Sequence, residues 1–118
     1  MNPLPASLDP TIAAYIEASN AGNTDALLGC FTPGAVVVDE GRTHRGAEEI
    51  RRWLAQTRSA YAFTFEVIDV AEPASESAET RESVVTCRVS GTFEGSPIQL
   101  RLFFTLEGDK IAALTIRE

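Results

Sequence analysis

The spacing of apolar residues changes once along the chain, from a helical period to a period of two. Near the N-terminus, Asp9 or Ser7 is a suitable N-cap, Pro10 fits the first helical turn, and Gly22 fits the position after the last turn. The residues between them that recur at helical spacing are Leu8, Ile12, Tyr15, Ile16 and Ser19. The pattern predicts an amphipathic helix that ends just before Gly22.

Two more helices and a strand are predicted before the period changes. A short helix is expected over residues 23–31, and the following segment 32–34 (TPG) ends it because proline cannot continue a helix. An apolar strand is expected over residues 35–39, followed by a glycine-bearing turn. A second long helix is expected over residues 47–61, and the residues on its apolar face are Ala47, Ile50, Trp53, Leu54 and Thr57.

From Tyr61 onward, apolar and polar residues alternate, which predicts antiparallel strands. The alternating apolar residues are Phe63, Phe65 and Val67, then Val85, Cys87 and Val89, then Ile98, Leu100, Leu102 and Phe104. Residues 94–97 and 107–110 contain glycine and are expected to form hairpin connections. The polar, acidic segment 73–82 is expected to be a solvated loop.

The order of elements predicts an α+β fold in a single domain over residues 1–118. Two helices and two strands precede the second long helix, and four strands follow it. Helices gathered at one end and strands at the other favour a curved antiparallel sheet whose apolar face packs on the helices. Such a sheet is expected to wrap around a central pocket.

Charge and composition exclude several classes of function. The formal net charge of −7 disfavours nucleic acid as a partner. One histidine and two cysteines give no metal-binding cluster, and no cofactor motif is present, so we expect neither a metal nor a cofactor. No apolar run is long enough to span a membrane, and no leader segment is visible, which predicts a cytoplasmic protein without membrane contact.

Asp39 is the first candidate for chemistry because it ends the apolar strand VVVD. Strand alternation puts Asp39 on the same face as Val37. If that face is interior, partial desolvation favours a carboxylate as a general base, and a nearby tyrosine hydroxyl can polarise a substrate carbonyl. The alternative is that Asp39 only ends the strand and accepts hydrogen bonds in the turn made with Glu40 and Gly41.

The chain resembles the SnoaL-like and ketosteroid-isomerase-like branch of the NTF2-like superfamily. The residues that carry this resemblance are YIEASNAGNTDALLGCFTPGAVVVDEG and the later RG-x-E-x-I-x-x-W, and the likeness extends over essentially the whole chain. It implies a cone-shaped α+β fold that carries isomerases, cyclases, dehydratases and plain binding modules. It also implies an assembly of two copies.

The resemblance assigns roles to two residues in particular. Tyr15 falls at the position of the oxyanion-hole tyrosine of ketosteroid isomerases and Asp39 at that of the proton-shuttling aspartate, 24 positions apart. Leu102 falls where those enzymes carry a second, protonated acid. This departure keeps open a second hypothesis, a binding or dimerisation module without catalysis.

A pocket in this fold is expected to bind a small hydrophobic molecule. The residues expected to line it are Val37, Trp53, Phe63, Phe65, Phe93, Leu102 and Phe104. Tyr15, Trp53 and the four phenylalanines have the alternative of filling the core. His44, between two arginines, is either a surface histidine or a catalytic one.

The outer sheet face is the expected contact between two copies of the chain. Its expected residues are Thr86, Arg88, Ser90, Gln99, Arg101, Phe103 and Thr105. A mixture of polar side chains and an aromatic ring is typical of a moderately polar subunit interface. The resemblance implies a homodimer formed through this face.

Overall fold

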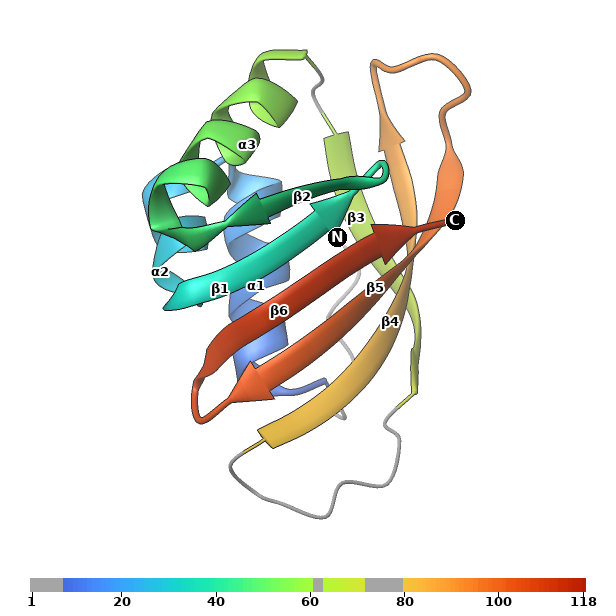
Figure 1. Ribbon diagram of the computed structural model, residues 1–118. Coiled ribbons are helices and arrows are strands. Elements are labelled where there is room, and N and C mark those ends of the chain that lie inside the picture. The colour runs from blue at the N-terminus through green and yellow to red at the C-terminus, as the bar shows by residue number, and fades with distance from the viewer. Residues whose placement is uncertain (1–7, 61–62, 72–79) are drawn as a thin grey trace.

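The structure is a computed structural model that describes residues 8–60, 63–71 and 80–118 (Figure 1). Along the chain, its elements follow the predicted order of two helices, two strands, a helix and four strands. They are α1 (Pro10–Ala21), α2 (Thr24–Gly29), β1 (Phe31–Asp39), β2 (Arg42–Arg45), α3 (Gly46–Ala60), β3 (Phe63–Ala71), β4 (Thr80–Gly91), β5 (Ile98–Glu107) and β6 (Lys110–Arg117). Ser7, Tyr61 and most of the expected loop 73–82 lie outside the described residues.

Side-chain caps fix the ends of the first two helices. The carboxylate of Asp9 accepts a hydrogen bond of 2.9 Å from the backbone N–H of Thr11, so Asp9 is the N-cap of α1. Gly22 ends α1 with a φ of 70°, a conformation that glycine adopts without steric penalty. Asn23 caps α2 through a 3.1 Å bond from the N–H of Ala26. None of the described helices is both long and apolar enough to cross a bilayer.

The boundary between α2 and β1 differs from the prediction. The short helix ends at Gly29 instead of reaching Phe31, and β1 begins at Phe31 instead of Ala35. Pro33 and Gly34 therefore lie inside the strand, where the pairing register with β6 shifts between Phe31 and Val36. A bulge is the position at which a strand tolerates proline, because the missing N–H interrupts the hydrogen-bonded ladder only locally.

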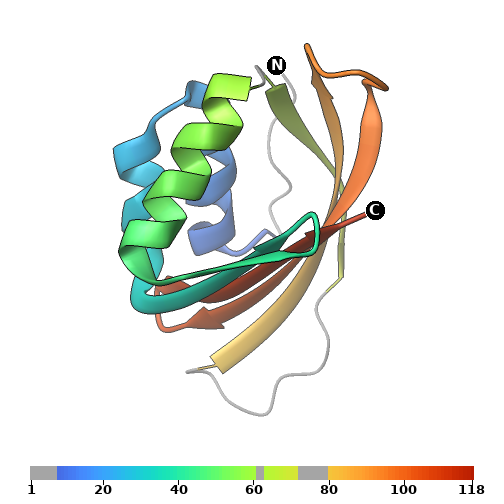
Figure 2. The same ribbon diagram turned by 45° about the horizontal axis from the view of Figure 1, so that its top comes forward.

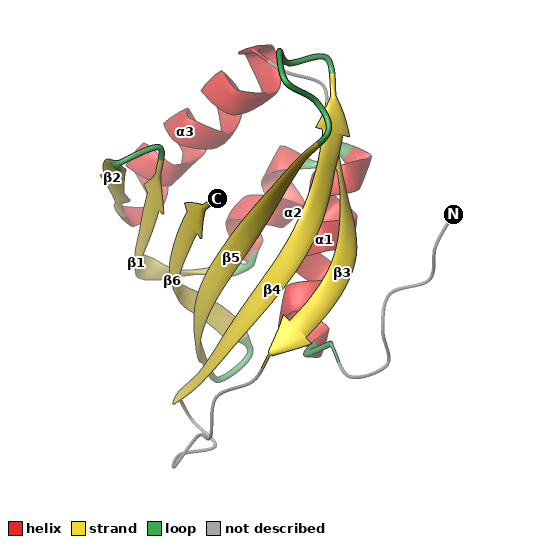
Figure 3. Ribbon diagram, turned by 90° about the vertical axis from the view of Figure 1, so that its right-hand side faces the viewer, coloured by secondary structure: helices red, strands yellow, loops and turns green. Residues whose placement is uncertain are grey.

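The described strands form one curved, open sheet in the order β2-β1-β6-β5-β4-β3. Strands β3 to β6 pair antiparallel, as predicted, whereas β1 runs parallel to β6. The three described helices lie together on the concave side of the sheet, and the convex side carries no element of the described chain (Figures 2 and 3). This is the α+β cone that the sequence predicts.

The core lies between the helices and the concave face of the sheet. Its largest fully buried side chains are Phe104, Ile12, Ile16, Leu27, Ile50, Leu102, Leu106, Ile111 and Leu114. Cys87 is also fully buried there, and desolvation raises the pKa of its thiol to about 12. Cys87 therefore stays protonated at neutral pH and does not serve as a nucleophile.

Candidate functional site

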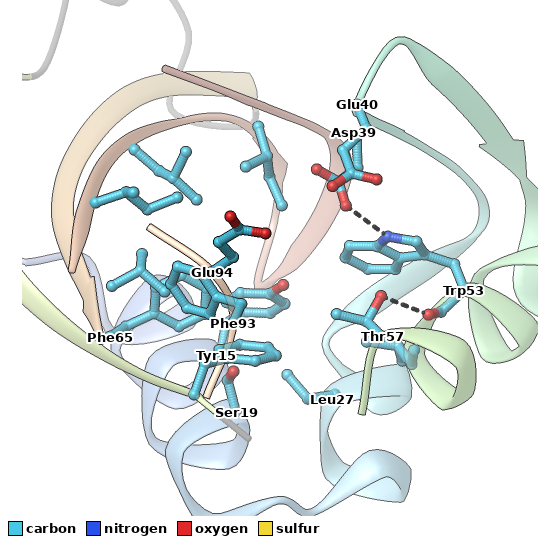
Figure 4. A pocket seen from close by; sticks show the side chains of 16 residues that line it. Tyr15, Ser19, Leu27, Asp39, Glu40, Trp53, Thr57, Phe65, Phe93 and Glu94 are labelled. Atoms are coloured by element: carbon cyan, nitrogen blue, oxygen red, sulfur yellow. Dashed lines mark hydrogen bonds between the residues drawn. The ribbon is translucent and has the colours of Figure 1, made fainter. Parts of the chain in front are cut away.

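A cavity of about 490 Å³ lies between the helices and the concave face of the sheet (Figure 4). The residues that line it come from all three described helices, from five strands, from the turn between β1 and β2 and from the connection between β4 and β5. They are Tyr15, Ser19, Leu27, Asp39, Glu40, Trp53, Leu54, Thr57, Phe63, Phe65, Val89, Phe93, Glu94, Ile98, Leu100 and Ile116. Aromatic and aliphatic side chains predominate, as in sites that bind small organic molecules.

Asp39 reaches this cavity from the end of β1. The strand alternation places it on the interior side with Val37, which is completely buried, while Asp39 itself is half-buried. Its Oδ2 accepts a hydrogen bond of 3.0 Å from the indole Nε1–H of Trp53 (Figure 4). Asp39 also directly precedes the Glu40–Gly41 turn. It therefore both ends the strand and lines the cavity, the two positions that the sequence analysis gave as alternatives.

Trp53 both lines the cavity and orients Asp39. It lies on α3, is 7% exposed, and presents its indole N–H to the carboxylate. The ring of His44, on β2, lies 5.9 Å from the Trp53 ring between centroids, with an interplanar angle of 31°. His44 is half-buried and is not among the residues that line the cavity, so its contact with the site is the one with the Trp53 ring.

Tyr15 approaches the cavity from α1. Its ring is 2% exposed and packs edge-to-face on Phe31, at 5.9 Å between centroids, and on Phe104, at 5.7 Å. Such contacts are typical of aromatic residues that fill a core. The same residue also lines the cavity, so the core and the cavity interpretations of Tyr15 both apply.

Four of the seven expected pocket residues line the cavity: Trp53, Phe63, Phe65 and Phe93. The other three, Val37, Leu102 and Phe104, are fully or almost fully buried and are not in its lining, which corrects the sequence analysis for these positions. Alternation along a strand identifies the inner face but not the part of that face which a neighbouring side chain covers. Phe104, for example, lies against the ring of Tyr15.

Asn20 fixes the strand that carries two of the aromatic residues. Its Nδ2 donates to the backbone oxygen of Phe65 at 3.0 Å, and its Oδ1 accepts from the N–H of Phe65 at 2.8 Å. The side chain of Asn20 thereby joins the end of α1 to β3. It pairs with the backbone of Phe65 as a residue of a neighbouring strand would, with one hydrogen bond donated and one accepted. The rings of Phe63 and Phe65, 5.4 Å apart between centroids, then face the same cavity.

The sequence analysis did not identify the acidic members of the lining other than Asp39. Glu40 follows Asp39 in the chain, and Glu94 lies in the connection between β4 and β5, 55 positions beyond Asp39. Glu40 could have been suspected from its adjacency to Asp39, but no spacing in the sequence indicates Glu94. Within the described residues, no three histidine, cysteine or acidic side chains are placed to hold a metal ion.

Comparison with known proteins agrees with this fold. Residues 12–114 match the family described as the SnoaL-like domain. A candidate polyketide cyclase from Sinorhizobium meliloti is 34% identical in sequence, with a TM-score of 0.84 over 93% of this chain and 95% of that one. Among curated proteins, no significant match was found.

More distant solved structures share the fold. A cystatin-fold protein from Novosphingobium aromaticivorans is 22% identical, with a TM-score of 0.70 over 92% of this chain and 95% of that one. A protein with a ketosteroid-isomerase-like fold from Catenulispora acidiphila, determined in complex with trimethylamine, is 18% identical, with a TM-score of 0.77 over 95% of this chain and 87% of that one.

Proposed function

Because the chain belongs to the SnoaL-like family, we propose that it binds a small hydrophobic carbonyl compound and moves a proton next to the carbonyl group. The observation that carries this proposal is that Asp39, half-buried and hydrogen-bonded by Trp53, lines the same apolar cavity as Tyr15. The resemblance to a candidate polyketide cyclase that is 34% identical supports chemistry of the isomerase or cyclase type.

In this proposal Asp39 is the base. Its Oδ2 is engaged by the indole of Trp53, which leaves Oδ1 to accept a proton from the carbon next to the substrate carbonyl. The electron pair of the broken C–H bond moves into the carbonyl and gives an enolate. An isomerase then returns the proton from Asp39 to another carbon. In a cyclase the enolate carbon instead attacks a second carbonyl, whose π electrons move to its oxygen, and that oxygen takes the proton back from Asp39.

Tyr15 is the proposed donor to the developing oxyanion. A hydrogen-bond donor that is fixed before the reaction stabilises the negative charge on the enolate oxygen without reorganisation. Leu102, which falls at the position of the second acid of ketosteroid isomerases, is fully buried and outside the cavity lining. We therefore expect slower turnover than a site with two donors supports, because each such donor typically contributes about two to three orders of magnitude.

A binding module without catalysis is the second candidate function. Leu102 favours it, and so does the lining itself, which within the described residues contains no arginine, lysine or histidine to stabilise an enolate. The two candidates differ in one observable: both bind a ketone, but only the enzyme exchanges the protons next to its carbonyl.

Proton exchange tests the proposal without a known substrate. Cyclic ketones such as tetralone and decalone are incubated with the protein in D2O, and the signals of the protons next to the carbonyl are followed by NMR. We expect exchange above the buffer rate, its loss in Asp39→Asn, and a drop of about two to three orders of magnitude in Tyr15→Phe. The amide oxygen introduced by Asp39→Asn can still accept the hydrogen bond from Trp53, so the melting temperature should change little.

Asp69→Asn is the matched control, because Asp69 is exposed on β3 and the substitution removes one charge outside the cavity. It should exchange like the wild type. Equal exchange in Asp39→Asn and the wild type would exclude Asp39 as the base. Ketone binding without any exchange would assign the protein to the binding class.

A further inference from the structure

The charged residues of the cavity indicate which charge its ligand carries. This inference rests on the proposed function, in which the cavity binds a small molecule. Three carboxylates belong to the lining, those of Asp39, Glu40 and Glu94, and among the described residues no basic side chain does. Arg42, which pairs with Asp39 across the β1–β2 hairpin, is exposed and outside the lining. An anionic ligand would therefore meet three like charges and no basic side chain of the described lining.

The carboxylates lie at the solvent-facing part of the cavity and come from two separate segments. Glu40 and Glu94 are exposed, whereas Tyr15, Leu27, Phe65 and other lining residues are buried. In Figure 4, Asp39 and Glu40 project from the end of β1 on one side, and Glu94 projects from the β4–β5 connection on the other. Neither glutamate takes part in the salt bridges of the described residues.

Aromatic rings line the cavity next to these carboxylates. Trp53 donates its indole N–H to Asp39, and Phe93 directly precedes Glu94 in the chain. Tyr15, Phe63 and Phe65 complete the set of aromatic residues in the lining. The faces of aromatic rings attract cations, and tryptophan does so most strongly. Rings together with carboxylates are the combination that recognises an ammonium group, in which a positive centre carries apolar substituents.

We infer that the carbonyl compound bound by this cavity also carries a cationic group, an amine or quaternary ammonium on an apolar body. The apolar body and the carbonyl group lie among the residues inside, and the cationic group lies at the opening between Glu40 and Glu94, which leaves Asp39 free to act as the base. A metal ion is a poorer occupant, because the described carboxylates do not come together as metal ligands. A cavity of about 490 Å³ is also far larger than a single ion requires.

The backbone at Glu40 is in keeping with this role. Glu40 has a φ of 53°, in the left-handed region where asparagine and glycine are the favoured residues. A glutamate there is conformationally unfavourable, and its position beside Asp39 adds a carboxylate to the opening of the cavity.

Three matched sets of ligands test the inference. The first set is adamantylamine, adamantyl methyl ketone and adamantane carboxylate, and the other two sets carry the same head groups on cyclohexyl and naphthylmethyl bodies. Their affinities are measured by isothermal titration calorimetry at neutral pH and low salt. We expect the ammonium compound of each set to bind about tenfold more tightly than the ketone, and the carboxylate to bind most weakly. The preference should shrink as salt is added.

The double variant Glu40→Gln and Glu94→Gln should remove most of the preference for the ammonium compound and leave ketone affinity within about twofold. The matched control is Glu17→Gln with Glu107→Gln, which makes the same change in net charge at exposed positions outside the cavity. The control should bind all the ligands like the wild type.

The outcomes separate this inference from the function on which it rests. Ketone binding with no preference for the ammonium compound overturns the inference and leaves the carbonyl-binding function intact. The inference is also overturned if the double variant keeps the preference for the ammonium compound, or if the control loses it equally. In either case the preference would not come from the carboxylates of Glu40 and Glu94. If no member of any set binds, both the inference and the proposed function fail.

Discussion

At the scale of single residues, Glu40 combines an unfavourable backbone conformation with a place in the lining of the cavity. With Gly41, at φ 76°, it forms the two-residue turn between β1 and β2. Turns of this kind, with positive φ at both central residues, favour Asn-Gly. Stability and ligand recognition therefore favour different residues at this position.

Replacing Glu40 with Asn should stabilise the protein by about 1 kcal/mol, because asparagine tolerates the left-handed conformation better than glutamate. Urea denaturation of the wild type and the variant measures this change in the free energy of unfolding. The same variant should lose part of its preference for ammonium ligands. An unchanged or lower stability would mean that the Glu40 side chain makes a compensating interaction.

At the scale of elements, the contact between α1 and β3 positions the two aromatic residues of β3 that line the cavity, Phe63 and Phe65. The side chain of Asn20 makes two hydrogen bonds to the backbone of Phe65 and so fixes the position of β3 relative to the end of α1. The strand also has a register shift in its pairing with β4, between Val67 and Asp69. Asn20 therefore holds the part of β3 that carries Phe63 and Phe65, which precedes the register shift in the chain.

Asn20→Ala should lower the free energy of unfolding by about 1 to 2 kcal/mol, since two hydrogen bonds are lost and the backbone N–H and oxygen of Phe65 lose their partner. Glu17→Ala, at an exposed position one turn earlier on α1, is the control and should cost much less. Urea denaturation of both variants measures the difference. Equal losses would show that the contact with β3 contributes nothing beyond helix propensity.

At the scale of the whole molecule, the convex face of the sheet is the surface that we expect to join two copies. Phe103 lies on this face, half-buried, with the guanidinium groups of Arg101 and Arg117 at 5.7 and 5.5 Å from its ring centroid. Half-buried Val84 and Thr86 lie on the neighbouring strand β4, where Val84 pairs with Phe103. An aromatic ring flanked by arginines is typical of residues that contribute strongly to an interface.

Light scattering coupled to size exclusion should report a dimer for the wild type and a monomer for Phe103→Glu. Ala55→Glu, on the exposed side of α3, introduces the same charge away from the convex face and should remain dimeric. A wild-type protein that is monomeric at all accessible concentrations would contradict the expected assembly. A dimer that persists in Phe103→Glu would place the interface on another surface.

The sequence alone determined the order of elements, the end of the first helix at Gly22, and the shared face of Val37 and Asp39 on the strand that ends at Asp39. These features depend on local periodicity and turn chemistry, which neighbouring residues specify. The sequence also showed the excess of acidic residues, though not their positions in space. It left the N-cap open between Asp9 and Ser7, and the structure shows Asp9 in that position.

Only the tertiary structure decided which inner-face residues reach the cavity. Leu102 and Phe104 alternate correctly but lie in the core, while Glu94 reaches the cavity from a predicted hairpin connection whose sequence does not indicate that the side chain faces inward. The hydrogen bond from Trp53 to Asp39 likewise joins a helix to a strand end. Periodicity specifies the direction of a side chain, but its depth depends on which other elements cover it, and that is settled only when the helices pack on the sheet.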